Sequence, residues 1–193
     1  MNSTASRILA LAAASTLVSL AWAKEPEAYF SDDFDAKVID HITVLPVLDH
    51  RIENPEPEAL NNHREMKRAI KIHVGKRRYP MTVETSLDYL NVITRDGLED
   101  QDPKMIAALG PEHARYVLLL VFEDSAVKFG VGKTTTAEMT GYLFDKESRS
   151  VLWRHTGSFK MKSGIVTGIG SKGTALLQVT RSVMITLPKK PKE

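Results

Sequence analysis

The sequence predicts one domain of the α+β or α/β class, with a mixed sheet of about five strands and helices packed on it. Three observations predict this fold. Residues 116–127 form a continuous apolar run, which is typical of a central strand. Residues 133–145 and 150–162 alternate apolar and polar side chains, and polar turns join the three segments into an antiparallel three-stranded meander in the C-terminal third. Apolar residues at helical spacing occur before and after the meander, and no internal repeat points to a second domain.

Residues 1–23 have the form of a cleaved signal peptide. Arg7 gives a short positive region, an uncharged apolar run follows at 8–23, and the run ends in small residues that signal peptidase accepts. We expect cleavage after Ala23 and a mature protein in the periplasm. Secretion is the alternative destination, and an uncleaved N-terminal anchor is the other reading of this segment.

The mature chain is expected to have three parts. A polar tether at 24–37 is acidic and poor in aliphatic residues, 38–188 forms the α/β envelope domain, and 189–193 is a basic tail. The net charge of +2 implies no general attraction to polyanions. Cysteine is absent, so the chain offers no disulfide, no thiolate nucleophile and no acceptor for a lipid anchor.

The first half of the domain reads as a strand, a helix and a second strand. Residues 38–51 are rich in β-branched residues, and Pro46 interrupts them, which favours an edge or a bulge. Residues 54–78 open with two prolines and then place apolar residues three and four positions apart, which predicts a helix that ends at Gly75. Residues 79–84 then predict a short strand.

Two signals for helix starts follow. Thr85 with Asp88 has the form of a capping box and predicts a helix over 86–97. Asp102 before Pro103 combines a cap residue with a proline at the first helical position, and predicts a helix that the next glycine ends.

The end of the chain predicts a strand, a glycine-rich connection and a last helix. The alternation of 150–162 places Val151 and Trp153 on one face of their strand and Leu152 on the other. The connection at 163–173 leads to a helix with one apolar stripe, formed by Leu176, Val179, Val183 and Leu187.

Two glycine motifs resemble nucleotide-binding loops, and we reject both. "KFGVGKTTTAEM" (128–139) has Val127 where a Walker A loop needs its first glycine, and the residues after Lys133 alternate as a strand. A strand does not present a helix N-terminus to a phosphate. "GIGSKG" (168–173) precedes a helix, but no strand with an acidic residue follows it, as a dinucleotide fold would require. We therefore predict no nucleotide and no cofactor.

The histidines do not form a metal site by their spacing, because none of the six follows an H-x-x-x-H or H-E-x-x-H pattern. No G-x-S-x-G elbow is present either. One enzymatic alternative stays open, a small hydrolase or metal-dependent enzyme that uses His41, Asp49 and His50 around the first strand. It requires these side chains to converge in space.

A cluster of cations is the strongest candidate for a binding surface. Seven Lys and Arg residues lie within fifteen positions of the first helix and its exit. They could bind anionic lipid headgroups or an acidic partner, or they could form a solvated face that Glu58 and Glu65 partly neutralise. The apolar character of 164–170 leaves a protein or membrane contact open for the glycine-rich connection as well. The predicted partner-binding residues are Arg64, Lys67, Arg68, Lys71, Lys76, Arg77, Arg78, Gly164, Gly168 and Gly170.

Several phrases of the sequence resemble a known family, among them "HITVLPVLDHR" (41–51), "GLED" (97–100) and "DKESRSVLW" (145–153). They are similar to those of bacterial envelope lipoproteins of unknown function whose α/β domain is like the periplasmic part of the curli secretion pore. The resemblance spans 38–188 and implies a mixed sheet with packed helices and a role in envelope assembly or secretion, without known chemistry. Those relatives usually carry a lipidated cysteine after the signal, which is absent here. A pore is not expected, because every loop except the start of 163–173 is too short or too polar to form a membrane-facing hairpin.

We therefore expect an exported, non-enzymatic periplasmic protein that serves as an accessory or assembly factor. Its partner would be another envelope protein or an anionic lipid surface, and nucleic acid is not expected in the exported compartment. The alternatives are the enzyme described above and a membrane-surface protein bound through the basic helix at 64–78. Homo-oligomerisation is left open.

Overall fold

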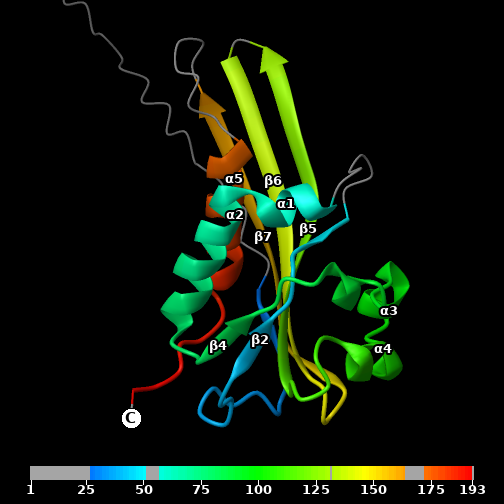
Figure 1. Ribbon diagram of the computed structural model, residues 1–193. Coiled ribbons are helices and arrows are strands. Elements are labelled where there is room, and N and C mark those ends of the chain that lie inside the picture. The colour runs from blue at the N-terminus through cyan, green and yellow to red at the C-terminus, as the bar shows by residue number, and fades with distance from the viewer. Residues whose placement is uncertain (1–26, 51–56, 131, 164–171, 193) are drawn as a thin grey trace, which may run out of the picture.

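The computed structural model describes residues 27–50, 57–130, 132–163 and 172–192. Its centre is one seven-stranded mixed sheet with helices on both faces, which confirms the predicted fold class (Figure 1). The strands follow the order β1-β7-β6-β5-β2-β4, and β3 also pairs with β5. The strands are β1 (Tyr29–Phe30), β2 (Ile42–Val44), β3 (Leu48–Asp49), β4 (Met81–Val83), β5 (Tyr116–Gly130), β6 (Gly132–Asp145) and β7 (Ser150–Ser163). The predicted signal peptide at 1–23 lies outside the described residues.

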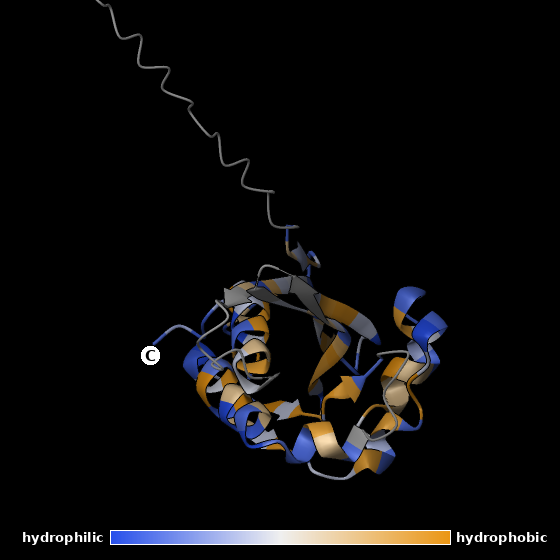
Figure 2. Ribbon diagram, turned by 90° about the horizontal axis from the view of Figure 1, so that it is seen from above, coloured by the Kyte–Doolittle hydropathy of each residue, from blue (hydrophilic) through white to orange (hydrophobic). Residues whose placement is uncertain are grey.

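Helical segments cover both faces of this sheet. Those on one face are α1 (Pro57–Asn62), α2 (Arg64–Ala69), the π-helical turn η1 (Ile70–Val74), the 3-10 turn η2 (Gly75–Arg77) and α5 (Lys172–Met184). Those on the other are the 3-10 turn η3 (Leu87–Leu90), α3 (Arg95–Glu99) and α4 (Pro103–Ala108). Seen from above, the two groups stand on opposite sides of the sheet (Figure 2).

The predicted meander forms the frame of the sheet. β5 pairs with β6, and β6 with β7, in antiparallel registers over nearly their whole length. Each strand has 14 or 15 residues, whereas strands of about five or six residues are usual. The three strands consequently run past the helices at the top of Figure 1.

β2 lies between β4 and β5 and pairs in parallel with both. Parallel pairing needs long crossovers. The segment 57–77 supplies one of them on the α5 face, and 87–108 supplies the other on the opposite face. The predicted interruption at Pro46 is confirmed, since β2 ends at Val44 and β3 begins at Leu48.

The sheet has seven strands rather than about five, because the strand predicted over 38–51 is divided into β2 and β3, and because β1 was not expected. β1 pairs with Trp153 and Arg154 of β7 and lies within the predicted tether at 24–37. Phe34, from the same stretch, packs against the core. A strand of two residues is too short to show an alternating pattern in the sequence. It forms by docking on the edge that β7 offers.

The alternating side chains of β5 divide the core into two parts. Leu118, Leu120 and Phe122 pack with residues of α2 and α5. Val117, Leu119 and Val121 pack with residues of α3 and α4 on the other face. A strand with both faces buried reads as a continuous apolar run, which is how β5 was predicted.

The predicted alternation of 150–162 is wrong at its start. A register shift separates Leu143 and Phe144 of β6, whose partners are Trp153 and Val151. The additional residue, Leu152, joins Trp153 in the core beneath α5, whereas Val151 joins the core beneath α4. A bulge of this kind places two successive residues opposite one partner, and the period of two does not reveal it.

The single helix predicted over 54–78 is divided. His63 has an extended backbone, and its Nδ1 accepts a hydrogen bond from the Glu65 N–H at 3.2 Å, so it caps α2. The helical turns then continue through η1 and η2. The predicted stop at Gly75 is wrong, because Gly75 has right-handed helical angles and Arg78 takes the left-handed conformation, with φ of 70°.

The predicted helix over 86–97 is also wrong and is replaced by two short segments. Ser86 caps η3, and Thr94 starts α3 by accepting a hydrogen bond from the Gly97 N–H at 3.0 Å. Gly97 lies inside α3, which continues to Glu99, so this glycine does not end a helix. It is buried, and a Cβ added to it would lie 2.8 Å from the Met105 sulfur. The β-branched run 92–94 favours the break, because such residues lose side-chain freedom in a helix.

The next helix start is confirmed. Asp102 accepts a hydrogen bond from the Lys104 N–H at 2.9 Å, and Pro103 is the first residue of α4. Gly110 follows the helix with φ of 62°, the left-handed region that favours glycine.

α5 lies directly on β6 and β7 because two glycines leave room for it. A Cβ on Gly141 would lie 2.7 Å from the Val183 side chain, and a Cβ on Gly157 would lie 2.7 Å from the Val183 backbone nitrogen. The predicted apolar stripe of this helix is confirmed as core, and Leu187 is buried just beyond its end. The approach of helix to sheet is therefore set by the absence of two side chains.

The C-terminal tail is fastened to the exit of η2. The Arg77 guanidinium donates hydrogen bonds to the carbonyls of Ile185 and Leu187, at 3.2 and 3.0 Å. The Tyr79 hydroxyl donates to the Pro188 carbonyl at 3.0 Å. The Lys190 N–H donates to the Arg77 carbonyl at 2.8 Å, which continues the attachment along the tail.

We expect Gly157→Ala to lower the free energy of unfolding by about 1–3 kcal/mol, because the new methyl group meets helix backbone that cannot turn aside. Chemical denaturation measures the change. Ser158→Ala is the matched control, since Ser158 is exposed in the same strand and its side chain points to the other face. Equal stability of the Gly157→Ala and Ser158→Ala variants would contradict the tight packing of α5.

The attachment by Tyr79 predicts a pH dependence. Burial raises the pKa of Tyr79 from 10.0 to about 12, which Arg77 opposes and Asp35 assists. A raised pKa means that the neutral phenol stabilises the fold, fully below pH 10 and less as the pH approaches 12. The stability difference between the wild type and Tyr79→Phe, measured by urea unfolding, should shrink over this interval. A constant difference would mean that the hydroxyl is not held as described.

Candidate partner-binding surface

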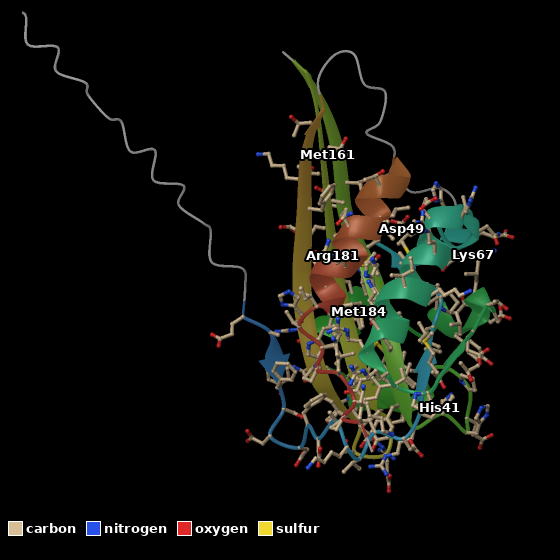
Figure 3. All side chains as sticks on the ribbon, turned by 90° about the vertical axis from the view of Figure 1, so that its left-hand side faces the viewer. His41, Asp49, Lys67, Met161, Arg181 and Met184 are labelled. Atoms are coloured by element: carbon tan, nitrogen blue, oxygen red, sulfur yellow. The ribbon has the colours of Figure 1, made fainter. Side chains whose placement is uncertain are left out.

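The predicted cation cluster lies on the outer side of α2, η1 and η2. The opposite side of these turns faces the core and contributes Met66, Ile70 and Val74. The outward side chains form a surface that we call the basic face, which consists of the exposed residues Arg64, Lys67, Arg68, Lys71, Lys76 and Arg78. Figure 3 shows Lys67 directed away from the sheet. The helical period thus separates an apolar side from a cationic side.

Few of these cations are neutralised. Arg68 pairs with Glu65 at 3.5 Å, and its side chain remains 58% exposed. Lys67 donates a hydrogen bond to the Asn62 side-chain oxygen at 3.4 Å, which leaves its charge unpaired. Within the part of the chain that the structure describes, Arg68 is the only cation of the basic face in an ion pair. A surface charge of this kind attracts an anionic partner and is screened by salt.

Arg77 differs from the other predicted residues. Its guanidinium holds the C-terminal tail, so it is half-buried and belongs to the fold more than to the surface. Local sequence could not show this, because the carbonyls it contacts are 108 and 110 positions away.

His73 lies beneath the basic face, buried in the π-helical turn between α2 and η2. Its Nε2 has no hydrogen-bond partner among the described residues. Burial lowers the pKa of His73, and the charges of Lys76, Arg181 and Arg77 lower it further. The imidazole is therefore a neutral core residue here and adds nothing to the surface charge at neutral pH.

The predicted glycine contacts cannot be placed. Gly164, Gly168 and Gly170 lie outside the described residues, between the end of β7 and the start of α5. Their assignment to a partner contact stays a prediction.

The enzymatic alternative fails on geometry. The His41 ring lies beside Thr82, with 3.0 Å between His41 Nε2 and Thr82 Oγ1, whereas His50 Nδ1 is 3.7 Å from a Glu123 carboxylate oxygen. Ile42, which follows His41, pairs with Tyr116 of β5, whereas Asp49, which precedes His50, pairs with Phe122. The two β5 positions are six residues apart, which is about 20 Å along a strand. Figure 3 shows His41 and Asp49 at different heights of the sheet. The three side chains do not converge.

Two absences bear on other site classes. Among the described residues, no group of three or more His, Asp or Glu side chains is arranged to hold a metal ion. The helices in the described ranges include none that is long and apolar enough to cross a membrane.

Sequence reasoning missed one charged hollow of about 580 Å³ at the opposite end of β5 from the hairpin tip. Arg115 forms ion pairs there with Asp145 at 3.0 Å and Glu147 at 2.6 Å, and the hydrogen bond to Asp145 raises the pKa of Arg115. Lys146 donates a hydrogen bond to the Pro111 carbonyl at 2.9 Å. These contacts tie the 145–149 turn to the residues before β5, so we assign them a structural role. In the sequence, this hollow is indicated by nothing more than the acidic residues of the 145–149 turn.

Comparisons with known proteins identify a fold and no family. No family model matches the sequence, and no curated protein matches it. Among solved structures, a subunit of a PelC dodecamer from Paraburkholderia phytofirmans aligns with a TM-score of 0.50 and 14% identity, over 84% of this chain and 97% of that one. The hypothetical protein CT253 from Chlamydia trachomatis gives 0.46 and 14%, over 75% and 93%. Lipoprotein GNA1162 from Neisseria meningitidis gives 0.45 and 16%, over 72% and 92%. The chain thus shares the fold of the PelC subunit, at an identity too low to transfer any binding residue.

Proposed function

We propose that this protein is an exported, non-enzymatic component of the bacterial cell envelope that serves as an accessory or assembly factor. It acts by binding an acidic partner through the basic face. The observation that carries the proposal is the set of six exposed cations on one side of α2, η1 and η2, of which one is paired within the described chain.

The basic face is held rigidly, which favours binding. The core side of α2 and η1 is buried against α5 and the sheet, and the exit of η2 is fastened to the C-terminal tail. Cations on a fixed backbone lose less conformational freedom on binding than cations on a loop. The arrangement fits recognition of a defined partner.

A protein partner fits better than a lipid surface. An interfacial helix binds a membrane by burying its apolar side between headgroups. Here the apolar side of α2 and η1 is buried in the protein core, so only charge remains for a membrane. Electrostatic attraction to an anionic membrane contributes about 1 kcal/mol of binding free energy for each Lys or Arg near the surface.

We also propose that the working form is a homo-oligomer. The PelC subunit that shares this fold comes from a dodecamer. An assembly factor that presents the same surface in several copies would bind its partner more tightly than one copy does.

Reversing the charge of Lys67 and Lys71 together should lower the capture of the protein partner from a periplasmic extract about tenfold or more, because both cations are exposed and central in the basic face. Pull-down followed by mass spectrometry measures it. The control reverses Lys37 and Lys160, two exposed cations outside the face. Arg77 is unsuitable for this purpose, since its loss would also free the tail.

Flotation with anionic liposomes separates the two partner classes. Binding of the wild type to liposomes at low salt, lost in high salt and in the Lys67→Glu/Lys71→Glu variant, would favour the lipid surface. If the variant with Lys67 and Lys71 reversed captures the same proteins as the variant with Lys37 and Lys160 reversed, the basic face has no part in the proposed function.

A further inference from the structure

The two helical layers carry opposite charge. Residues 64–78 contain seven Lys and Arg against one Glu, whereas 84–104 contain six Asp and Glu against two Lys and Arg. The first segment covers the α5 face of the sheet, and the second covers the opposite face. The net charge of +2 hides this separation.

The acidic side is built in the same way as the basic face. Leu90, Leu98 and Ile106 of η3, α3 and α4 turn into the core, and the carboxylates between them turn outward. We call the exposed set Asp88, Asp96, Glu99 and Asp100 the acidic face. None of the four forms an ion pair with a described cation.

The geometry points to a second copy of this chain as the acidic partner, an inference that rests on the proposed function. We infer that the basic face of one copy docks on the acidic face of the next. Both faces are helical, exposed and short of internal partners, and they are complementary in charge. Complementary potentials steer association and fix its register.

The positions of the two faces determine the kind of assembly. They lie on opposite sides of the sheet (Figures 1 and 2), so a twofold dimer would place like charges together and is disfavoured. A head-to-tail contact uses a different surface on each partner and leaves one free face at each end. Such contacts form a ring when the rotation closes, and a filament when it does not.

The test compares two double variants of the full protein with the wild type. Lys67→Glu/Lys71→Glu reverses two of the six charges of the basic face, and Asp96→Lys/Glu99→Lys reverses two of the four charges of the acidic face. All four positions are exposed. Sedimentation velocity should show wild-type oligomers at low salt that dissociate at high salt. In each double variant, self-association should be weaker by about tenfold or more. Lys37→Glu/Lys160→Glu should assemble like the wild type.

Mixing the two variants excludes trivial misfolding. Each keeps one intact face, so an equimolar mixture should form heterodimers that neither variant forms alone. Assembly of either variant like the wild type, a monomeric wild type at low salt, or no association in the mixture would overturn the inference. If self-association is insensitive to both variants while capture from the extract still depends on Lys67 and Lys71, this inference fails and the proposed function stands. If neither depends on them, both fail.

Discussion

The contact between α5 and the sheet at Gly141 and Gly157 is the constraint on which the rest of the structure depends. It lets the helix backbone approach β6 and β7 closely, and it encloses Trp153 beneath the helix. α2 and η1 then pack beside α5, and their buried stripe follows from that position. The outward direction of the cations thus depends on the packing of α2 and η1 beside α5. A surface that looks like a property of one helix is set by packing in the layer below it.

The charges on both layers follow from the same rule. Each helical segment gives its apolar residues to one of the two cores that β5 separates, so its charged residues have only the solvent side left. The sequence of 64–78 happens to fill that side with Lys and Arg, and the sequence of 84–104 fills it with Asp and Glu. Two chemically different surfaces thus arise from helical segments that pack on opposite faces of one sheet.

Alternating side chains predicted the meander, and single residues predicted the break at Pro46 and the helix cap at Asp102. Each of these features depends on neighbouring residues alone. Features that depend on distant residues were missed. β1 exists only because β7 offers an edge, and the helical turns continue past Gly75 to Arg77, whose guanidinium is held by the C-terminal tail. The cation cluster could be predicted from composition, yet the role of Arg77 could not, since its acceptors belong to the other end of the chain. The separation of His41 from His50 likewise follows from pairing with β5, which local patterns do not contain.

The place of β2 in the sheet has a consequence for how the chain folds. Ile42 pairs with Tyr116, 74 positions later, and β2 is buried between β4 and β5 although it is among the first strands in the chain. Loops of that length must close before the parallel rungs form, and such topologies fold slowly. The meander, whose strands are neighbours in the chain, can form first and offer its open β5 edge. Until β2 occupies that edge, the nascent domain exposes a long apolar strand, so a holdase chaperone would find its best target at this stage of maturation.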